Sequence, residues 1–142
     1  MTVRRPLVLV SGLPQELPAG DTPAGAGTLV AVFDGGGSAL VAGTKCYVRA
    51  PVACTITKAT LIADQSGALV VDVWKDTYAN YPPTVDDTIT ASAKPTLSSA
   101  AKAEDSTLTG WTKAIAAGDV LGFNVDSCTT ITWAQLLLEV TR

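Results

Sequence analysis

The side chains that could carry out catalysis are few in this 142-residue chain, because it contains no histidine. Without histidine, neither a Ser-His-Asp nor a Cys-His nucleophilic system can form, and the commonest zinc ligand sets are excluded. Cys128 therefore has no obvious general base to activate it. A thiol in such a setting usually packs as a small hydrophobic side chain, and we interpret Cys128 in this way.

Carboxylates are the remaining groups that could act as acids, bases or ligands of a hard cation. Asp72 and Asp76 fall on one face of an expected strand, and Asp86 and Asp87 follow a proline pair. Paired acids at a suitable separation can hydrolyse a glycosidic bond or bind calcium. The spacing matches neither pattern strongly, and aspartates near turns usually accept backbone hydrogen bonds. We therefore expect no enzyme, no cofactor and no metal site, with a small glycosidase or a calcium site as alternatives.

Aromatic side chains are the other candidates for a binding site, because rings can stack on sugars. Trp74, Trp111 and Trp133 fall on three different expected strands, as a sandwich core requires, and we interpret them as core residues. Tyr78 and Tyr81 lie in a proline-rich loop instead. These two tyrosines are the expected exposed pair and the possible ligand face.

The elements that position these residues are short β-rich segments separated by turns. Residues 69–74 alternate in the period-2 pattern of a strand, and Gln65–Gly67 and Gly118-Asp119 occupy expected turns. Gly35–Gly37 is expected to form a hairpin connection, since no GK[ST] follows it as in a phosphate-binding loop. The fold class is therefore all-β, an antiparallel jelly-roll-like β-sandwich. The expected strands are residues 28–34, 45–49, 54–62, 67–76, 87–92, 107–112, 119–126 and 130–141.

Residues 93–106 show no strand pattern, and they are expected to form a surface crossover. Ser98 or Ser99 could cap one or two turns of helix there.

The three cysteines, Cys46, Cys54 and Cys128, contain no CxxC pair. We expect buried thiols, with a Cys46–Cys54 disulfide as the alternative.

Residues 1–27 differ from the rest of the chain because four prolines interrupt them. Prolines block a continuous helix or a central strand, so this segment is expected to be an extended N-terminal arm ahead of a β-sandwich domain at 28–142. The aliphatic run Leu7–Val10 must bury itself somewhere. It could add a strand to a neighbouring sheet edge or fold back on its own domain, and we favour the first.

Composition excludes several classes of partner. The chain is 47% hydrophobic and only 16% charged, which favours contacts with other proteins. The ten Lys and Arg residues are scattered and the net charge is −3, so nucleic-acid binding is disfavoured. Leu7–Val10 is too short for the core of a secretory signal, and no segment has the roughly 20 apolar residues of a membrane span. We expect a soluble, unexported protein that contacts no membrane.

Two segments carry a family resemblance. Leu13–Thr22 contains an LPAGD sequence, and Val71–Thr84 leads from an expected strand into the Pro82-Pro83 loop. On these segments the chain resembles virion structural proteins of tailed bacteriophages, of the head-fibre, decoration and tail-fibre type. The resemblance continues through Ala93–Ser98, Thr109–Trp111 and Gly118–Leu121.

The resemblance implies a virion structural protein whose N-terminal arm attaches to a particle and whose β-rich domain projects outward. It implies other virion proteins as partners, either the major capsid protein or tail subunits. It also implies a homo-oligomer, with a trimer favoured, located in the virion and assembled in the host bacterial cytoplasm. The arm residues expected to dock on the partner are Leu7, Val8, Leu9, Val10, Leu13, Leu17 and Asp21.

The chain departs from long fibres because no shaft, heptad repeat or chaperone-like tail follows the β domain. A capsid decoration or cement protein, or a short head fibre, therefore fits the resemblance at least as well as a long tail fibre. A tail-associated receptor-binding or carbohydrate-binding module, using Tyr78 and Tyr81, is the alternative function.

Overall fold

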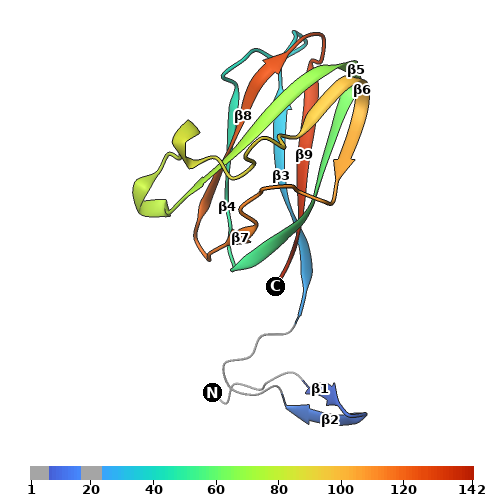
Figure 1. Ribbon diagram of the computed structural model, residues 1–142, viewed down its shortest axis with the longest axis vertical. Helices are drawn as coiled ribbons and strands as arrows, with labels where there is room; N and C mark the ends of the chain where they lie inside the picture. Colours follow the sequence, from blue (N-terminus) through green and yellow to red (C-terminus); the bar gives the residue numbers. More distant parts are fainter. Residues whose placement is uncertain (1–6, 17–23) are drawn as a thin grey trace.

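The computed structural model describes residues 7–16 and 24–142, and it confirms the all-β fold class (Figure 1). Two short 3-10 turns, η1 (Tyr78–Asn80) and η2 (Val85–Asp87), are the helical elements of these residues. Within them, no helix is long and apolar enough to cross a membrane. The strands are β1 (Leu7–Val10), β2 (Leu13–Glu16), β3 (Ala26–Asp34), β4 (Lys45–Arg49), β5 (Cys54–Asp76), β6 (Thr96–Asp105), β7 (Ala114–Ile115), β8 (Val120–Cys128) and β9 (Trp133–Thr141).

The long strand β5 organises the domain. Its first half, Thr55–Ala63, pairs with β9, and β9 pairs with β3. Its second half, Leu69–Asp76, pairs with β8, and β8 pairs with β4. All these pairs are antiparallel, and β6 and β7 also pair with β5. Because one strand serves both halves, the seven-stranded sheet curves into a nearly closed, sandwich-like arrangement (Figure 1).

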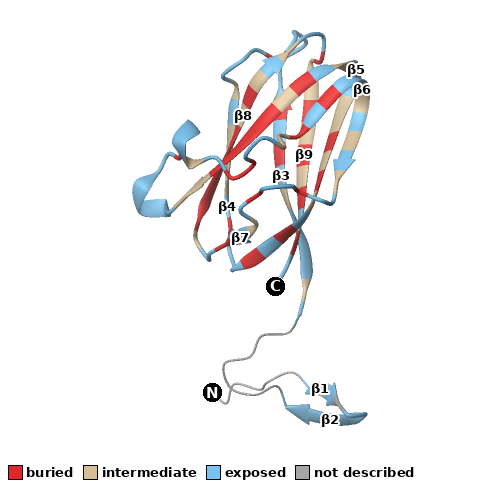
Figure 2. Ribbon diagram, viewed as in Figure 1, coloured by how far each residue is buried: buried red, intermediate tan, exposed pale blue. Residues whose placement is uncertain are grey.

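The core lies between the two halves of this curved sheet. Buried residues alternate along β9 and the first part of β5, whereas Val71–Trp74 of β5 and Val120–Phe123 of β8 are buried without interruption (Figure 2). Burying each apolar side chain stabilises the fold by about 1.5–3 kcal/mol. The fully buried side chains of these strands include Leu61, Leu69, Val71, Val73, Leu121, Phe123, Val125, Leu136 and Leu138.

The expected turn at Gln65–Gly67 is wrong, because β5 runs through it as a continuous strand. The pairing of β5 with β6 shifts register between Ile62 and Gly67, so the strand bends without ending. A Cβ added at Gly67 would lie 2.6 Å from Oγ1 of Thr130. Glycine is therefore needed here for close packing against the segment before β9.

The segment 87–112 also differs from expectation. Residues 88–92 and 107–112 are loops, apart from a single bridge between Thr88 and Trp74, and Asp87 ends η2. The expected crossover at 93–106 instead contains β6. Its serines and alanines carry little strand propensity, but Leu97 is buried and β5 supplies a pairing edge. Tertiary pairing therefore overrides local propensity.

The Gly35–Gly37 tract is a connection between strands, but not a hairpin. It joins β3 to β4, and these strands pair with β9 and β8 respectively, so the chain crosses between the two halves of the sheet. Gly36 and Gly37 have φ values of 63° and 89°, which confirms the expected positive φ. The N–H of Gly36 donates to Oδ1 of Asp34 at 2.8 Å.

Candidate functional site

The N-terminal residues form a β-hairpin, here called the arm hairpin (β1–β2). Ser11 and Gly12 connect the strands with φ values of 51° and 80°, as a two-residue type I′ turn requires. Within the arm, Leu7–Val10 pairs with Leu13–Glu16, a partner that was not expected, and the expected strand addition to a neighbouring sheet stays a prediction for the other edge of β1. The Ser11-Gly12 dipeptide directly after the aliphatic run Leu7–Val10 was the sequence signal for this turn.

The arm hairpin leaves aliphatic side chains in solvent. Leu7, Leu9 and Leu13 are 68%, 76% and 64% exposed. Val8 is half-buried, and Val10 completes the strand. The other two residues expected to dock, Leu17 and Asp21, lie outside the described residues. An isolated two-stranded hairpin is marginally stable in water, so this surface suits burial against a partner.

The two outer edges of the arm hairpin differ. A two-residue turn makes Val10 and Leu13 a hydrogen-bonded pair, so the next pair, Leu9 and Pro14, directs its backbone groups outward. Pro14 has no N–H, which weakens the β2 edge as a pairing surface. Leu7 and Leu9 keep their N–H groups on the β1 edge. The β1 edge is therefore the one that can accept a further strand.

The two candidate tyrosines follow β5. Tyr78 and Tyr81 are 63% and 52% exposed, which confirms their expected exposure. The ring of Tyr81 meets the ring of Tyr47 edge-on, with centroids 5.2 Å apart. The guanidinium carbon of Arg49 lies 4.3 Å from the centroid of the Tyr78 ring, within the range of a cation–π contact. We call these four side chains the aromatic ledge.

Two members of the aromatic ledge, Tyr47 and Arg49, could not be found from the sequence. They lie at alternate positions of β4, which the fold places beside the Tyr78–Pro83 loop. Gly122 of β8 makes room for this packing, because a Cβ there would lie 3.1 Å from Cγ of Pro83 and 3.2 Å from Cε1 of Tyr47. In the sequence, the one feature that pointed to this contact was the pair of positive residues, Lys45 and Arg49, on a short expected strand.

Asp72, the central catalytic candidate, is buried and fully hydrogen-bonded. Its Oδ1 accepts from the hydroxyls of Thr88 at 2.6 Å and Thr90 at 2.8 Å. Its Oδ2 accepts from Nε1 of Trp74 at 3.1 Å and lies 3.2 Å from Nζ of Lys94. Trp74 belongs to β5 itself, whereas Thr88, Thr90 and Lys94 follow it, and their contacts hold the segment after β5 against the strand. The carboxylate is thus structural and faces no open site.

The neighbouring charges extend this network. Nζ of Lys94 donates to Oδ2 of Asp126 at 2.6 Å, and Asn124 donates to Oδ1 of Asp126 at 2.7 Å. The hydrogen bond to Asp126 is the main reason that the pKa of Lys94 is raised, and the contact with Asp72 acts in the same direction. Lys94 therefore stays charged between two carboxylates.

Asp76 and Asp87 serve turns, as their positions predicted, whereas Asp86 is exposed. Asp76 accepts from the N–H of Thr77 at 2.7 Å, and Asp87 accepts from the N–H of Thr84 at 2.7 Å. Among the described residues, no three His, Cys, Asp or Glu side chains are grouped closely enough to hold a metal ion. Cys46, Cys54 and Cys128, all within the described part of the chain, carry free thiols.

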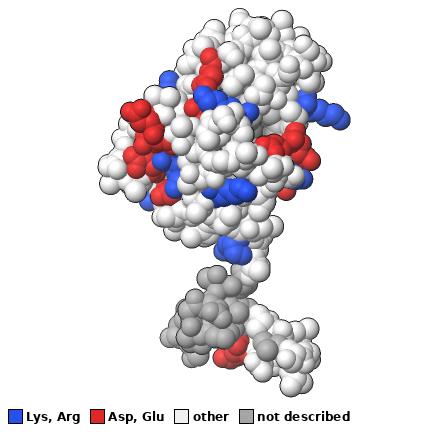
Figure 3. Space-filling view, in the orientation of Figure 1, with Lys and Arg blue, Asp and Glu red and all other residues white. Residues whose placement is uncertain are grey.

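Two of the three tryptophans are buried, and charges of both signs share the surface. Trp74 and Trp111 are buried as expected, although Trp111 lies in a loop, and Trp133 is half-buried at the start of β9. On the face shown in Figure 3, acidic and basic side chains are interspersed between wide uncharged areas.

The fold and these surfaces define an all-β domain preceded by an arm hairpin with exposed leucines. No protein-family model matches the chain, and no curated protein matches it. Among solved structures, it is similar to a chain in the structure of infectious bursal disease virus Gx strain, with 13% identity and a TM-score of 0.35. The alignment covers 97% of this chain and 36% of that chain, so this chain spans about a third of its length. A similarity this loose carries no argument about function.

Proposed function

We propose that the chain is a structural protein of a bacteriophage virion, a capsid decoration or cement protein or a short head fibre. The arm hairpin docks on a capsid or tail subunit, and the β-sandwich is displayed on the particle, as one copy of a homo-oligomer. The observation that carries this proposal is the exposure of Leu7, Leu9 and Leu13 on a hairpin whose strands pair, within residues 7–16 and 24–142, with each other alone. The family resemblance of the sequence supports the same role.

The mode of docking that we propose is strand addition to the β1 edge. That edge keeps its outward N–H groups at Leu7 and Leu9, whereas Pro14 interrupts the β2 edge. Main-chain hydrogen bonds would provide affinity, and the leucine side chains would fill apolar pockets of the partner. A single partner strand, on one side of the hairpin, is the occupant that this geometry favours.

Removing residues 1–22 should leave a folded domain that no longer binds phage particles assembled without this protein. The measurement is co-sedimentation with those particles, with circular dichroism to confirm the fold. Leu9→Ala should weaken association by about tenfold or more, because burying one leucine contributes about 1.5–3 kcal/mol. Leu9→Pro should weaken it further, since it also removes the outward N–H.

Proline is acceptable at position 9 because Pro14 already occupies the directly opposite position of the hairpin. The matched control is Gln15→Ala, an exposed polar residue of the same hairpin, which should bind like the wild type. Undiminished association of the truncated chain would show that docking does not use the arm. Equal binding by Leu9→Ala and Leu9→Pro would reject strand addition while leaving side-chain docking intact.

A second candidate function, binding of a surface carbohydrate, is favoured by the aromatic ledge. Tyr78 and Tyr81 are exposed yet held in place by Arg49 and Tyr47, so their rings lose little freedom when they stack on a sugar. We expect glycan-array binding that Tyr81→Ala abolishes and that Val85→Ala, an exposed apolar residue of the same loop, leaves intact. Absence of binding across host polysaccharides would reject this function.

A further inference from the structure

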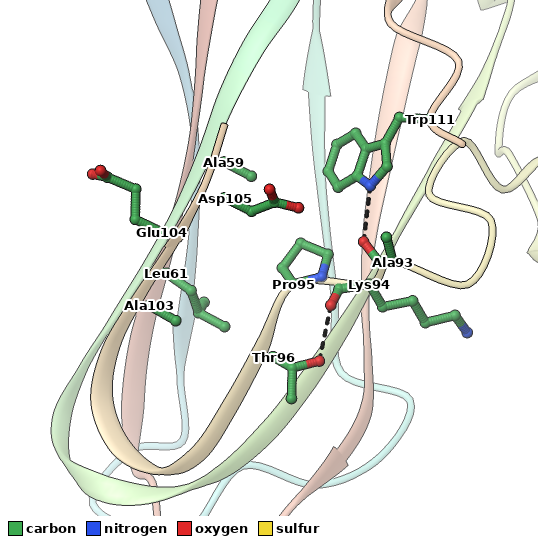
Figure 4. A pocket seen from close by; sticks show the side chains of 10 residues that line it. All are labelled: Ala59, Leu61, Ala93, Lys94, Pro95, Thr96, Ala103, Glu104, Asp105 and Trp111. Atoms are coloured by element: carbon green, nitrogen blue, oxygen red, sulfur yellow. Dashed lines mark hydrogen bonds between the residues drawn. The ribbon is translucent and has the colours of Figure 1, made fainter. Parts of the chain in front are cut away.

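A pocket of about 180 Å³ opens between the β5–β6 pair and the loops that carry Pro95 and Trp111 (Figure 4). Neither the arm hairpin nor the aromatic ledge contributes to it. Its walls come from segments far apart in the sequence, which the antiparallel pairing of Ala59–Ile62 with Lys102–Asp105 brings together. The residues that line it are Ala59, Leu61, Ala93, Lys94, Pro95, Thr96, Ala103, Glu104, Asp105 and Trp111.

Six of the ten residues that line the pocket are apolar. Three alanines, Ala59, Ala93 and Ala103, leave the space that larger side chains would fill, and Trp111 closes one side. The indole Nε1 of Trp111 donates to the carbonyl oxygen of Ala93 at 2.8 Å. Since its only polar group is engaged, the indole presents carbon atoms to the pocket.

One charged group faces this apolar space. The carboxylate of Asp105 points into the pocket in Figure 4, whereas the carboxylate of Glu104 points away from it, as alternation along β6 requires. Oδ1 of Asp105 accepts from the N–H groups of Thr107 at 2.8 Å and Leu108 at 3.1 Å. Oδ2 makes no hydrogen bond to residues 7–16 or 24–142, and Asp105 forms no ion pair with them.

The lysines near the pocket contact groups other than Asp105, and Nζ of Lys113 donates to the carbonyl oxygen of Thr107 at 3.4 Å. Lys58 lies 3.6 Å from Glu104 and 3.6 Å from Glu139, and the side chain of Lys94 reaches away from the pocket to Asp126 (Figure 4). Within the described part of the chain, the half-buried carboxylate of Asp105 thus lacks a counter-ion. A cationic ligand would supply one.

We propose that this pocket binds a small organic cation, a primary ammonium group on a short hydrocarbon body. The ammonium would pair with Oδ2 of Asp105, and the hydrocarbon would pack on Trp111, Leu61 and the three alanines. A sugar fits less well, because a pyranose carries several hydroxyls and only one charged side chain converges on the space. Buried hydroxyls without partners cost free energy.

The volume sets the size of the ligand. An apolar cavity of about 150 Å³ holds one benzene molecule, so this pocket accepts roughly five to seven non-hydrogen atoms. The n-butylammonium ion has the right size and charge, and 1-butanol is its neutral counterpart of equal size. The same chemistry is presented by a free alkylamine and by a lysine side chain of a protein.

The test is an NMR titration of the full chain with n-butylammonium chloride, which follows the indole N–H signals of the three tryptophans. We expect saturable shifts at Trp111 and at the amides of Thr107 and Leu108, with a dissociation constant in the millimolar range that suits so few atoms. Trp74, which bonds to Asp72 outside the pocket, should not shift. Binding of 1-butanol should be at least about fivefold weaker.

Two variants and one control sharpen the test. Asp105→Asn keeps an oxygen for the Thr107 and Leu108 amides but removes the charge, and it should weaken n-butylammonium binding about tenfold. Ala103→Leu should abolish binding by filling the space. Asp34→Asn is the matched control, because Asp34 also accepts a turn N–H with Oδ1 but lies outside the pocket. It should bind like the wild type.

The proposal is overturned if 1-butanol binds as tightly as n-butylammonium. It is also overturned if the Asp105→Asn variant binds n-butylammonium with the affinity of the wild type. It is also overturned if methyl α-glucopyranoside saturates the Trp111 signal while n-butylammonium does not. If both variants bind normally, the pocket is not the site. Nα-acetyl-lysine methylamide separates the two sources: binding tighter than that of n-butylammonium assigns the site to a lysine side chain, and weaker binding assigns it to a free amine.

Discussion

Replacing Phe123 by alanine is expected to destabilise the domain by about 3–5 kcal/mol. Phe123 lies on β8, is fully buried, and stands in register with Val73 of β5 on one side and Cys46 of β4 on the other. Removing the ring loses its burial and leaves a cavity between the two halves of the sheet. Because small domains are stable by about 5–15 kcal/mol, this loss is a large fraction of the total. Urea denaturation followed by tryptophan fluorescence measures it.

Two further variants control for this result. Phe123→Leu keeps part of the side chain and should cost clearly less than Phe123→Ala. Val41→Ala truncates a side chain that is 68% exposed, so its effect should stay within about 0.5 kcal/mol. If Phe123→Ala changed stability by no more than Val41→Ala does, the two halves of the sheet would not share the core described above.

The strands with strong local signals could be predicted from the sequence. Lys45–Arg49 was expected with the bounds of β4, and β3, β8 and β9 were expected within a few residues of their ends. Such strands can be recognised from the local sequence, because apolar and polar residues alternate along them and glycines mark the turns between them. By contrast, Thr96–Asp105 consists mainly of serines, alanines and charged residues, and it becomes a strand by pairing with the outer edge of β5. That pairing depends on the tertiary structure.

The candidate sites were also predictable only in part from the sequence. The exposure of Tyr78 and Tyr81 followed from their proline-rich loop, and the apolar character of Leu7–Val10 was visible in the sequence. The residues that contact Tyr78 and Tyr81 could not be predicted, because Tyr47 and Arg49 reach the aromatic ledge only through the pairing of β4 with β8. Asp105 was expected in a surface crossover and Trp111 in a strand, so the sequence did not place them together. Only the β5–β6 pairing brings them to one pocket.

Replacing Asp72 by alanine is expected to destabilise the domain by about 3 kcal/mol, because it removes a buried carboxylate that accepts three hydrogen bonds and pairs with the half-buried Lys94. The hydroxyls of Thr88 and Thr90 and the indole N–H of Trp74 would lose their acceptor. Lys94 would keep Asp126 as a partner, which limits the loss. Asp86→Ala, an exposed aspartate that follows the same strand, should change stability by no more than about 0.5 kcal/mol.

The same carboxylate should make stability depend on pH. Burial raises the pKa of Asp72, but hydrogen bonds from Thr88, Thr90, Trp74 and Lys94 outweigh it and hold the pKa below its ordinary value. Its contribution is therefore present above the unfolded-state pKa of about 4 and is lost as pH falls through the lower folded-state pKa. Asp72→Asn should thus be less stable than the wild type at pH 7, with a difference that shrinks at about pH 3. A difference that stayed constant with pH would show that Asp72 acts through its shape and not its charge.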